Sequence, residues 1–153
     1  MRVQLVNSYV SAAIDVLARE TGEPVTKGAL SLQANPYTSE EVTAMVGVSG
    51  GLAGTLYLSM AESTALGLVS RMLGQPSEVF DEIAQSGIAE LANVVGGVAG
   101  VALANAGHTT TITPPLLLMG AGARLSLVEI QRIVVPLVTA VGQVCVHVAL
   151  RDG

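Results

Sequence analysis

The longest uncharged stretch of the chain limits its fold more than any other feature. Between Glu90 and Arg124 there is no Asp, Glu, Lys or Arg. Such a stretch is buried in a folded core or embedded in a membrane. Its continuous apolar part, residues 91–106, is shorter than the ~20 residues that span a hydrocarbon layer, and no cations flank it to set an orientation. We therefore expect a buried core helix and no membrane insertion.

Size and composition fit one folded domain over residues 1–153. Half of the residues are hydrophobic and only 12% are charged, so the composition is not that of a disordered chain. The net charge is −5 with seven Lys and Arg in total, which leaves no basic patch for nucleic acid. Cys145 is the only cysteine, and the N-terminus lacks a signal-peptide pattern. We expect a cytoplasmic protein in which Cys145 is a small buried hydrophobe.

The order of periodic segments predicts the fold class. Helical spacing covers residues 3–20 and 61–73, and a longer helix is expected over 78–106. Strands are expected at 25–34, 41–48, 52–60, 125–135 and 142–150, with Ser49-Gly50-Gly51 as a hairpin turn. Runs of strands separated from runs of helices favour an α+β fold with an antiparallel sheet. A helix followed by strands, twice over, also hints at an internal duplication.

The long helix carries two polar groups among small and apolar residues. At 100° per residue, Ser86, Glu90 and Asn93 fall on one face, which continues through Gly97 and Gly100. The opposite face is an apolar stripe, made of Ile88, Ala92, Val95, Ala99 and Ala102. An exposed helix face normally carries Lys, Glu, Gln or Arg, and each glycine costs roughly 1 kcal/mol relative to alanine.

Two interpretations of this face remain open. The glycines could allow tight packing against another helix of the same chain, with Glu90 and Asn93 satisfied nearby. Alternatively, the face could be a docking surface that presents a carboxylate and a carboxamide, one helical turn apart, to a partner. Solvent access to Glu90 and Asn93 distinguishes the two.

The same residues carry a resemblance to a known family. Ser86-x3-Glu90-x2-Asn93, followed about twenty residues later by Pro115, resembles the signature of the CheC/CheX/FliY chemotaxis phosphatases. The stretch AMVGVSGGLAGTLYLSM resembles the family's central hairpin, LVSRMLG the end of the following helix, and ITPPLLLMG the strand after the long helix. There is one Glu-x2-Asn copy, so the chain most resembles the single-module CheX branch.

The resemblance implies a sandwich of helices packed on an antiparallel sheet, and a homodimer. It also implies accelerated hydrolysis of the aspartyl phosphate of a CheY-like response regulator, which itself binds the Mg²⁺. Asn93 would orient the attacking water and Glu90 would pair with the regulator's lysine. Ser86 would buttress the docking face and Pro115 would shape the adjoining strand. From the wheel, Gly97 and Gly100 would form the floor that the partner approaches.

Other functions are less well supported by the residues. Related flagellar switch modules bind signalling partners without catalysis, so a non-catalytic binding or assembly module is the main alternative; retention of both Glu90 and Asn93 favours the phosphatase. His108 and His147 lack further ligands at metal-binding spacing, so no metal site is expected.

Overall fold

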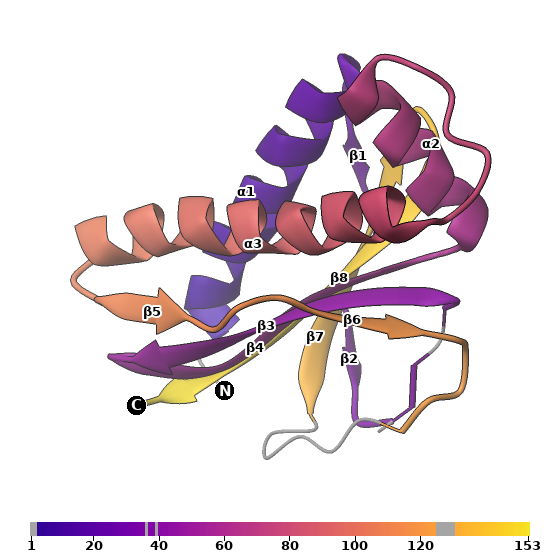
Figure 1. The fold of residues 1–153 in the computed structure, drawn as a ribbon. Helices are drawn as coiled ribbons and strands as arrows, with labels where there is room; N and C mark the ends of the chain where they lie inside the picture. Colours follow the sequence, from indigo (N-terminus) through magenta and orange to yellow (C-terminus); the bar gives the residue numbers. More distant parts are fainter. Residues whose placement is uncertain (1–2, 36, 39, 125–130) are drawn as a thin grey trace.

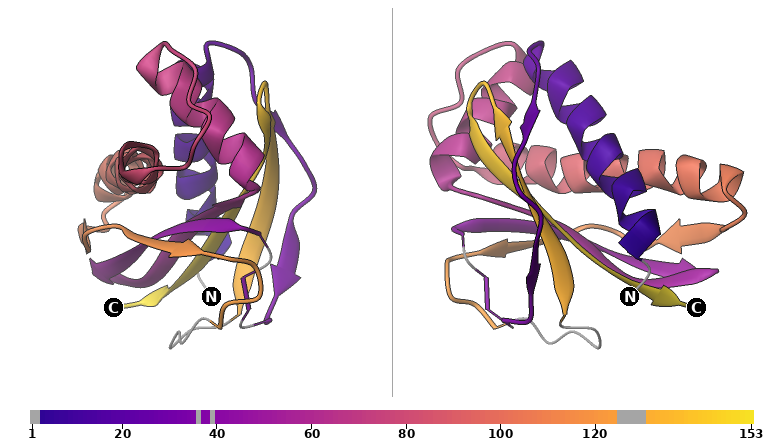
Figure 2. Two further views of the ribbon diagram at one scale, coloured as in Figure 1. Left: turned by 45° about the vertical axis from the view of Figure 1, so that its right-hand side comes forward. Right: turned by 180° about the vertical axis from the view of Figure 1, so that it is seen from behind.

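The chain folds into a layer of three helices packed on one face of a twisted antiparallel sheet (Figures 1 and 2). The computed structural model describes residues 3–35, 37–38, 40–124 and 131–153. The helices are α1 Val3–Thr21, α2 Glu62–Leu73 and α3 Glu82–Asn105. The described strands are β1 Thr26–Lys27, β2 Ser31–Gln33, β3 Val42–Gly50, β4 Leu52–Met60, β5 Thr110–Ile112, β6 Leu116–Met119, β7 Arg132–Thr139 and β8 Gly142–Asp152. The predicted α+β class and antiparallel sheet are confirmed.

The strand order is symmetric about the central β4–β8 pair. It runs β1-β7-β8-β4-β3-β5, with β2 also on β7 and β6 also on β3. Each half of the chain thus contributes a two-part edge strand that pairs with the other half's sheet. The arrangement is the one that the twofold helix-then-strands order suggested.

Apolar side chains of the central strands build the core together with the helices. Leu52, Leu56 and Leu58 of β4 are fully buried between the sheet and the helices. Helix α1 closes the core with residues three and four apart, a spacing that puts them on one helix face; they are Val6, Val10, Ala13, Val16 and Leu17. The β3–β4 hairpin forms at the expected glycines, and Gly50 has a φ of 109°.

Two predicted strands differ from the structure. Residues 25–34 form two short strands, β1 and β2, because the register on β7 shifts by one residue between them, beside Pro136, which cannot donate to the ladder. The first part of the expected strand at 125–135, residues 125–130, lies outside the described residues, and β7 begins at Arg132.

Helix α3 begins at Glu82, four residues later than the helix expected over 78–106, and ends at Asn105. It has 24 residues, and by length and composition it could cross a membrane, with a mean hydropathy of 1.6 over its most apolar window. In the fold it packs along α1, β3 and β5 (Figure 1). One face of α3 supplies core residues, and 39% of this apolar window is buried in the fold.

Candidate docking face on helix α3

The start of α3 is fixed by a side-chain cap. Asp81 is extended, and its Oδ1 accepts a hydrogen bond from the Ala84 amide at 3.0 Å. Such a cap satisfies one of the amides that a helix N-terminus leaves unpaired. From this start the helix runs without interruption to Asn105, so the angular positions of its residues follow from their spacing.

The polar residues of α3 lie on the face away from the core. Ser86 and Glu90 are exposed and Asn93 is half-buried, whereas Ile88 and Val95 are fully buried. The Asn93 Nδ2 atom lies 3.5 Å from the Glu90 Oε1 atom, the long limit of a hydrogen bond. This contact does not use the carboxamide oxygen of Asn93. The pair therefore reaches solvent, as the docking interpretation requires.

The glycines of α3 divide into one that packs and two that do not. A Cβ atom on Gly96 would lie 3.3 Å from both Ile112 and Val46, so this glycine lets the helix sit close to the sheet. A Cβ on Gly97 would meet nothing within 4 Å, and one on Gly100 would meet only the Thr110 Oγ1 atom, at 3.8 Å. The chain's own packing thus explains Gly96 but does not require Gly97 or Gly100.

Bare backbone beside these two glycines forms one wall of an open groove. The groove, with a volume of about 440 Å³, runs between the second half of α3 and β5. Gly97, Gly100 and Val101 line the helix side, and Thr110 and Thr111 line the strand side. The groove begins one helical turn after Asn93, so the polar pair and the bare backbone form one continuous surface.

Pro115 lies between the two parts of the edge strand beside α3. Strand β5 pairs with β3 at residues 48–50 and β6 pairs with β3 at residues 42–45. Pro114 and Pro115 both stand opposite Val46, because the pairing register shifts by one residue between β5 and β6. Prolines cannot donate to a strand ladder, so this half-buried Pro115 interrupts and bends the edge strand.

One residue that was predicted to belong to the buried apolar stripe is not buried. Ala102 is exposed, whereas Gly96 and Leu103, which the wheel left outside the stripe, are buried. Helix α3 crosses a twisted sheet, so the buried face rotates along the helix. The first half of the stripe is as predicted, and the second half turns toward Leu103.

Two exposed apolar residues on this helix face were missed. Ile83 is 65% exposed and Val101 is 64% exposed. On the wheel both lie about 20° from Glu90, so they extend the face at its two ends. Their angular position on the helix follows from the sequence, but their exposure to solvent is known only from the structure.

Outside α3, a buried polar cluster surrounds His147 on the opposite face of the sheet. The His147 Nε2 atom lies 2.8 Å from the Ser59 Oγ atom, and Arg132 Nε donates to Nδ1 at 3.2 Å. The ring stacks on Tyr57 with 4.2 Å between centroids. Burial and the neighbouring guanidinium lower the pKa of His147 to about 3, so the ring is neutral.

Cys145 is half-buried rather than buried as predicted, and burial raises the pKa of its thiol. Within the described part of the chain, no group of three His, Cys, Asp or Glu side chains could hold a metal ion.

Fold and face together define a class: an α+β protein with helices on an antiparallel sheet, which presents a carboxylate and a carboxamide on an open helix face. The family model for the chemotaxis phosphatase CheX matches residues 42–138. The chain therefore belongs to the CheX family of chemotaxis phosphatases.

Individual relatives agree with this membership. The chain is 28% identical over 126 residues to the CheY-P phosphatase CheX of Thermotoga maritima, with 82% of this chain and 81% of the relative covered. A crystal structure of a chemotaxis protein CheX from Desulfovibrio desulfuricans has a TM-score of 0.86 at 25% identity, with 97% of this chain and 99% of that chain covered. CheX in the Borrelia burgdorferi CheX–CheY–BeF3–Mg²⁺ complex has a TM-score of 0.83 at 23% identity, covering 99% of this chain and 100% of that chain.

Proposed function

We propose that this chain accelerates hydrolysis of the aspartyl phosphate of a CheY-like response regulator. The observation that carries the proposal is the solvent-reachable Glu90–Asn93 pair on α3, in a chain that belongs to the CheX family. The relative from Thermotoga maritima is a CheY-P phosphatase, and the Borrelia burgdorferi relative forms a complex with CheY.

Asn93 is the residue that would act at the reacting centre. An acyl phosphate is hydrolysed by in-line attack of water, and catalysis consists largely of positioning and charge stabilisation. A carboxamide is a poor base, but it offers two donors and an acceptor, so it can hold a water in a fixed orientation. The oxygen of Asn93, which the Glu90 contact leaves free, is the acceptor suited to this water.

Glu90 would hold the regulator in position. A CheY-like active site contains a lysine beside the phosphorylated aspartate, and Glu90 is an exposed carboxylate one turn from Asn93. An ion pair between the two would use a charge-assisted hydrogen bond. When the Glu90 carboxylate turns to that lysine, its long contact with the Asn93 amide is released.

The other predicted residues would serve docking. Gly97 and Gly100 leave the helix backbone bare, so that a surface of the regulator can approach it closely. Ser86 is exposed one turn before Glu90 and would buttress the first half of the face. Pro115 would support the face indirectly, through the bend it makes in the edge strand under α3.

The proposal needs no cofactor on this chain. Mg²⁺ would be held by the regulator, where it neutralises charge on the phosphoryl group. We further infer that the protein works in the cytoplasm, as a homodimer; sedimentation of the purified protein tests the dimer.

The direct test measures the lifetime of a phosphorylated CheY-like regulator with and without the purified protein. We expect substoichiometric amounts of the protein to shorten this lifetime. Binding to the regulator with no change in the lifetime would instead identify a non-catalytic binding module.

A further inference from the structure

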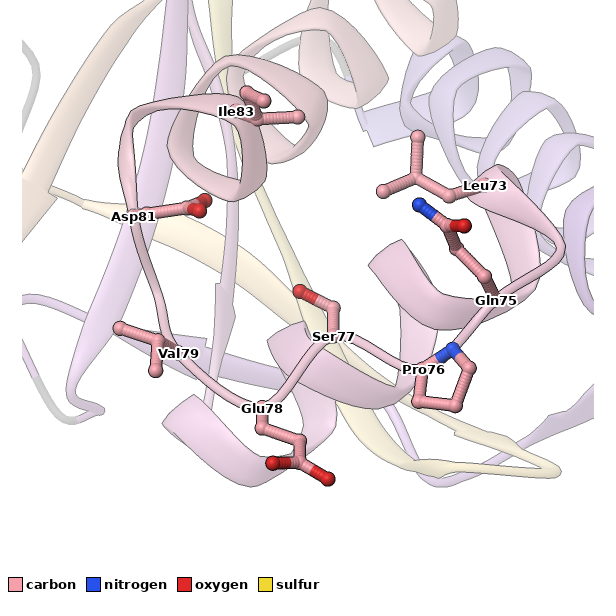
Figure 3. Close-up of a pocket in the computed structure, with 8 residues that line it drawn as sticks. All are labelled: Leu73, Gln75, Pro76, Ser77, Glu78, Val79, Asp81 and Ile83. Carbon is pink, nitrogen blue, oxygen red and sulfur yellow. The ribbon is translucent and has the colours of Figure 1, made fainter.

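A patch of exposed apolar side chains lies where α2 ends and α3 begins. Leu73, Val79 and Ile83, here named the α2–α3 patch, are 48%, 70% and 65% exposed. Leu73 and Ile83 face each other across a pocket of about 360 Å³, and Gln75, Ser77 and Asp81 point into the same space (Figure 3). Exposed apolar groups gathered around a pocket are typical of interaction sites.

The loop that carries the patch is held in place by the fold. Phe80 is buried in the core, and its carbonyl accepts a hydrogen bond from the Gln85 side chain at 3.0 Å. The Ser77 amide donates to the Ser70 Oγ atom of α2 at 2.9 Å. The pocket is therefore preformed, and a partner would spend little free energy on ordering it.

The surroundings of the patch are acidic. Glu78, Asp81 and Glu82 are exposed around it, and the sequence contains no Lys or Arg between Arg71 and Arg124. Glu90 adds a fourth carboxylate on the same side of the helix. A complementary surface would bring basic side chains around an apolar one.

The patch adjoins the Glu90–Asn93 face and lies within reach of the same partner. Ile83 precedes Asn93 by ten residues, which is about 15 Å along the helix axis. A standard interface buries about 800 Å² on each partner, a footprint roughly 30 Å across. A regulator centred on Asn93 would therefore reach Ile83 at one rim, and Val101 at the other.

We propose that the α2–α3 patch is a second contact for the response regulator and sets affinity for it. An apolar side chain of the regulator enters between Leu73 and Ile83, and flanking basic side chains pair with Glu78 and Asp81. This inference rests on the proposed phosphatase function. It adds that recognition is divided from catalysis: the patch acts on binding, and Asn93 acts on the chemical step.

The test compares kinetic constants for the phosphorylated CheY-like regulator whose phosphate the wild-type protein removes. Ile83→Ala removes the apolar side chain and increases helix propensity, so the fold is retained. We expect Ile83→Ala to raise KM about tenfold and leave kcat unchanged. Leu32→Ala is the matched control, because Leu32 is similarly exposed but lies on β2, across the sheet from β5; its KM should equal that of the wild type.

Charge is tested separately with Glu78→Gln at two salt concentrations. We expect KM to rise about threefold at low salt and to approach the wild-type value at high salt, because screening removes the same attraction. If the wild-type protein is active and Ile83→Ala leaves KM unchanged, the proposed role of the α2–α3 patch is wrong and the proposed phosphatase function stands. A wild-type protein with no effect on the phosphate lifetime would overturn the proposed function, and the patch with it.

Discussion

The carboxamide nitrogen of Asn93 lies 3.5 Å from a carboxylate oxygen of Glu90, on the solvent side of a helix whose other side is core. The contact is long, so it orients the Asn93 amide and leaves its carboxamide oxygen available to a partner. A single rigid helix thus fixes the relative position of a charged docking group and a neutral positioning group. Such a pair suits a reaction whose partner supplies the phosphoryl group and needs only a well-placed water.

Asn93→Ala should abolish catalysis and leave the fold intact. The variant removes the groups that would orient the water, so we expect kcat to fall at least about 100-fold. Alanine favours the helix, and Asn93 is only half-buried, so the melting temperature should stay at or above the wild-type value. Single-turnover loss of phosphate from the regulator measures the effect. Full activity in this variant would rule out the assigned role.

Glu90→Gln should weaken binding more than chemistry. The substitution keeps shape and removes the charge that would pair with the regulator's lysine. We expect KM to rise between about five- and thirtyfold, with a smaller dependence on salt than in the wild type. Titration of the regulator by fluorescence or calorimetry checks the affinity. Asp15→Asn, an exposed change on α1, is the control and should leave KM unaltered.

Substituting the two adjacent glycines of α3 should have opposite consequences. Gly97→Leu places a side chain in open space, so we expect unchanged or slightly raised stability but at least tenfold weaker binding of the regulator. Gly96→Leu drives its side chain against Ile112 and Val46 and should destabilise the fold by about 1–3 kcal/mol. Urea unfolding and binding measured on both variants separate these effects. Tight binding by Gly97→Leu would show that the partner does not approach this part of the helix.

The sequence predicted the helices well because each has a strong apolar period and clear stop signals. It also predicted which face of α3 carries Glu90 and Asn93, since a helix fixes angular positions by spacing alone. It could not predict that Ala102 is exposed, because the rotation of the buried face depends on the twist of the sheet beneath it. The α2–α3 patch was missed for a related reason: Leu73 and Ile83 belong to different helices, and only the tertiary fold brings them together.

The cluster around His147 was also beyond sequence reasoning. Arg132, Ser59 and His147 come from three strands and meet only through the register of β4, β7 and β8. Each has a hydrogen-bond partner in the cluster, which is what allows polar groups to be buried here. Because Arg132 donates to Nδ1, that nitrogen is an acceptor, and the ring proton lies on Nε2 facing Ser59.

The burial of a neutral His147 makes stability depend on pH. Its pKa is lowered from 6.5 to about 3 in the folded state, by burial first and by the Arg132 charge second. Between these values the unfolded chain binds a proton that the folded chain does not, so stability is full above about pH 6.5 and falls as the pH drops toward 3. One such group contributes a slope of up to about 1.4 kcal/mol per pH unit. Urea unfolding at pH 7.5, 6.5 and 5.5 measures this slope, before most carboxylates titrate. His147→Phe keeps an aromatic ring beside Tyr57 but cannot be protonated, so the slope of its stability against pH should flatten in this window. Its overall stability should fall, because Ser59 and Arg132 lose their contacts with the ring nitrogens. An equal slope in the variant and the wild type would assign the pH dependence to other groups.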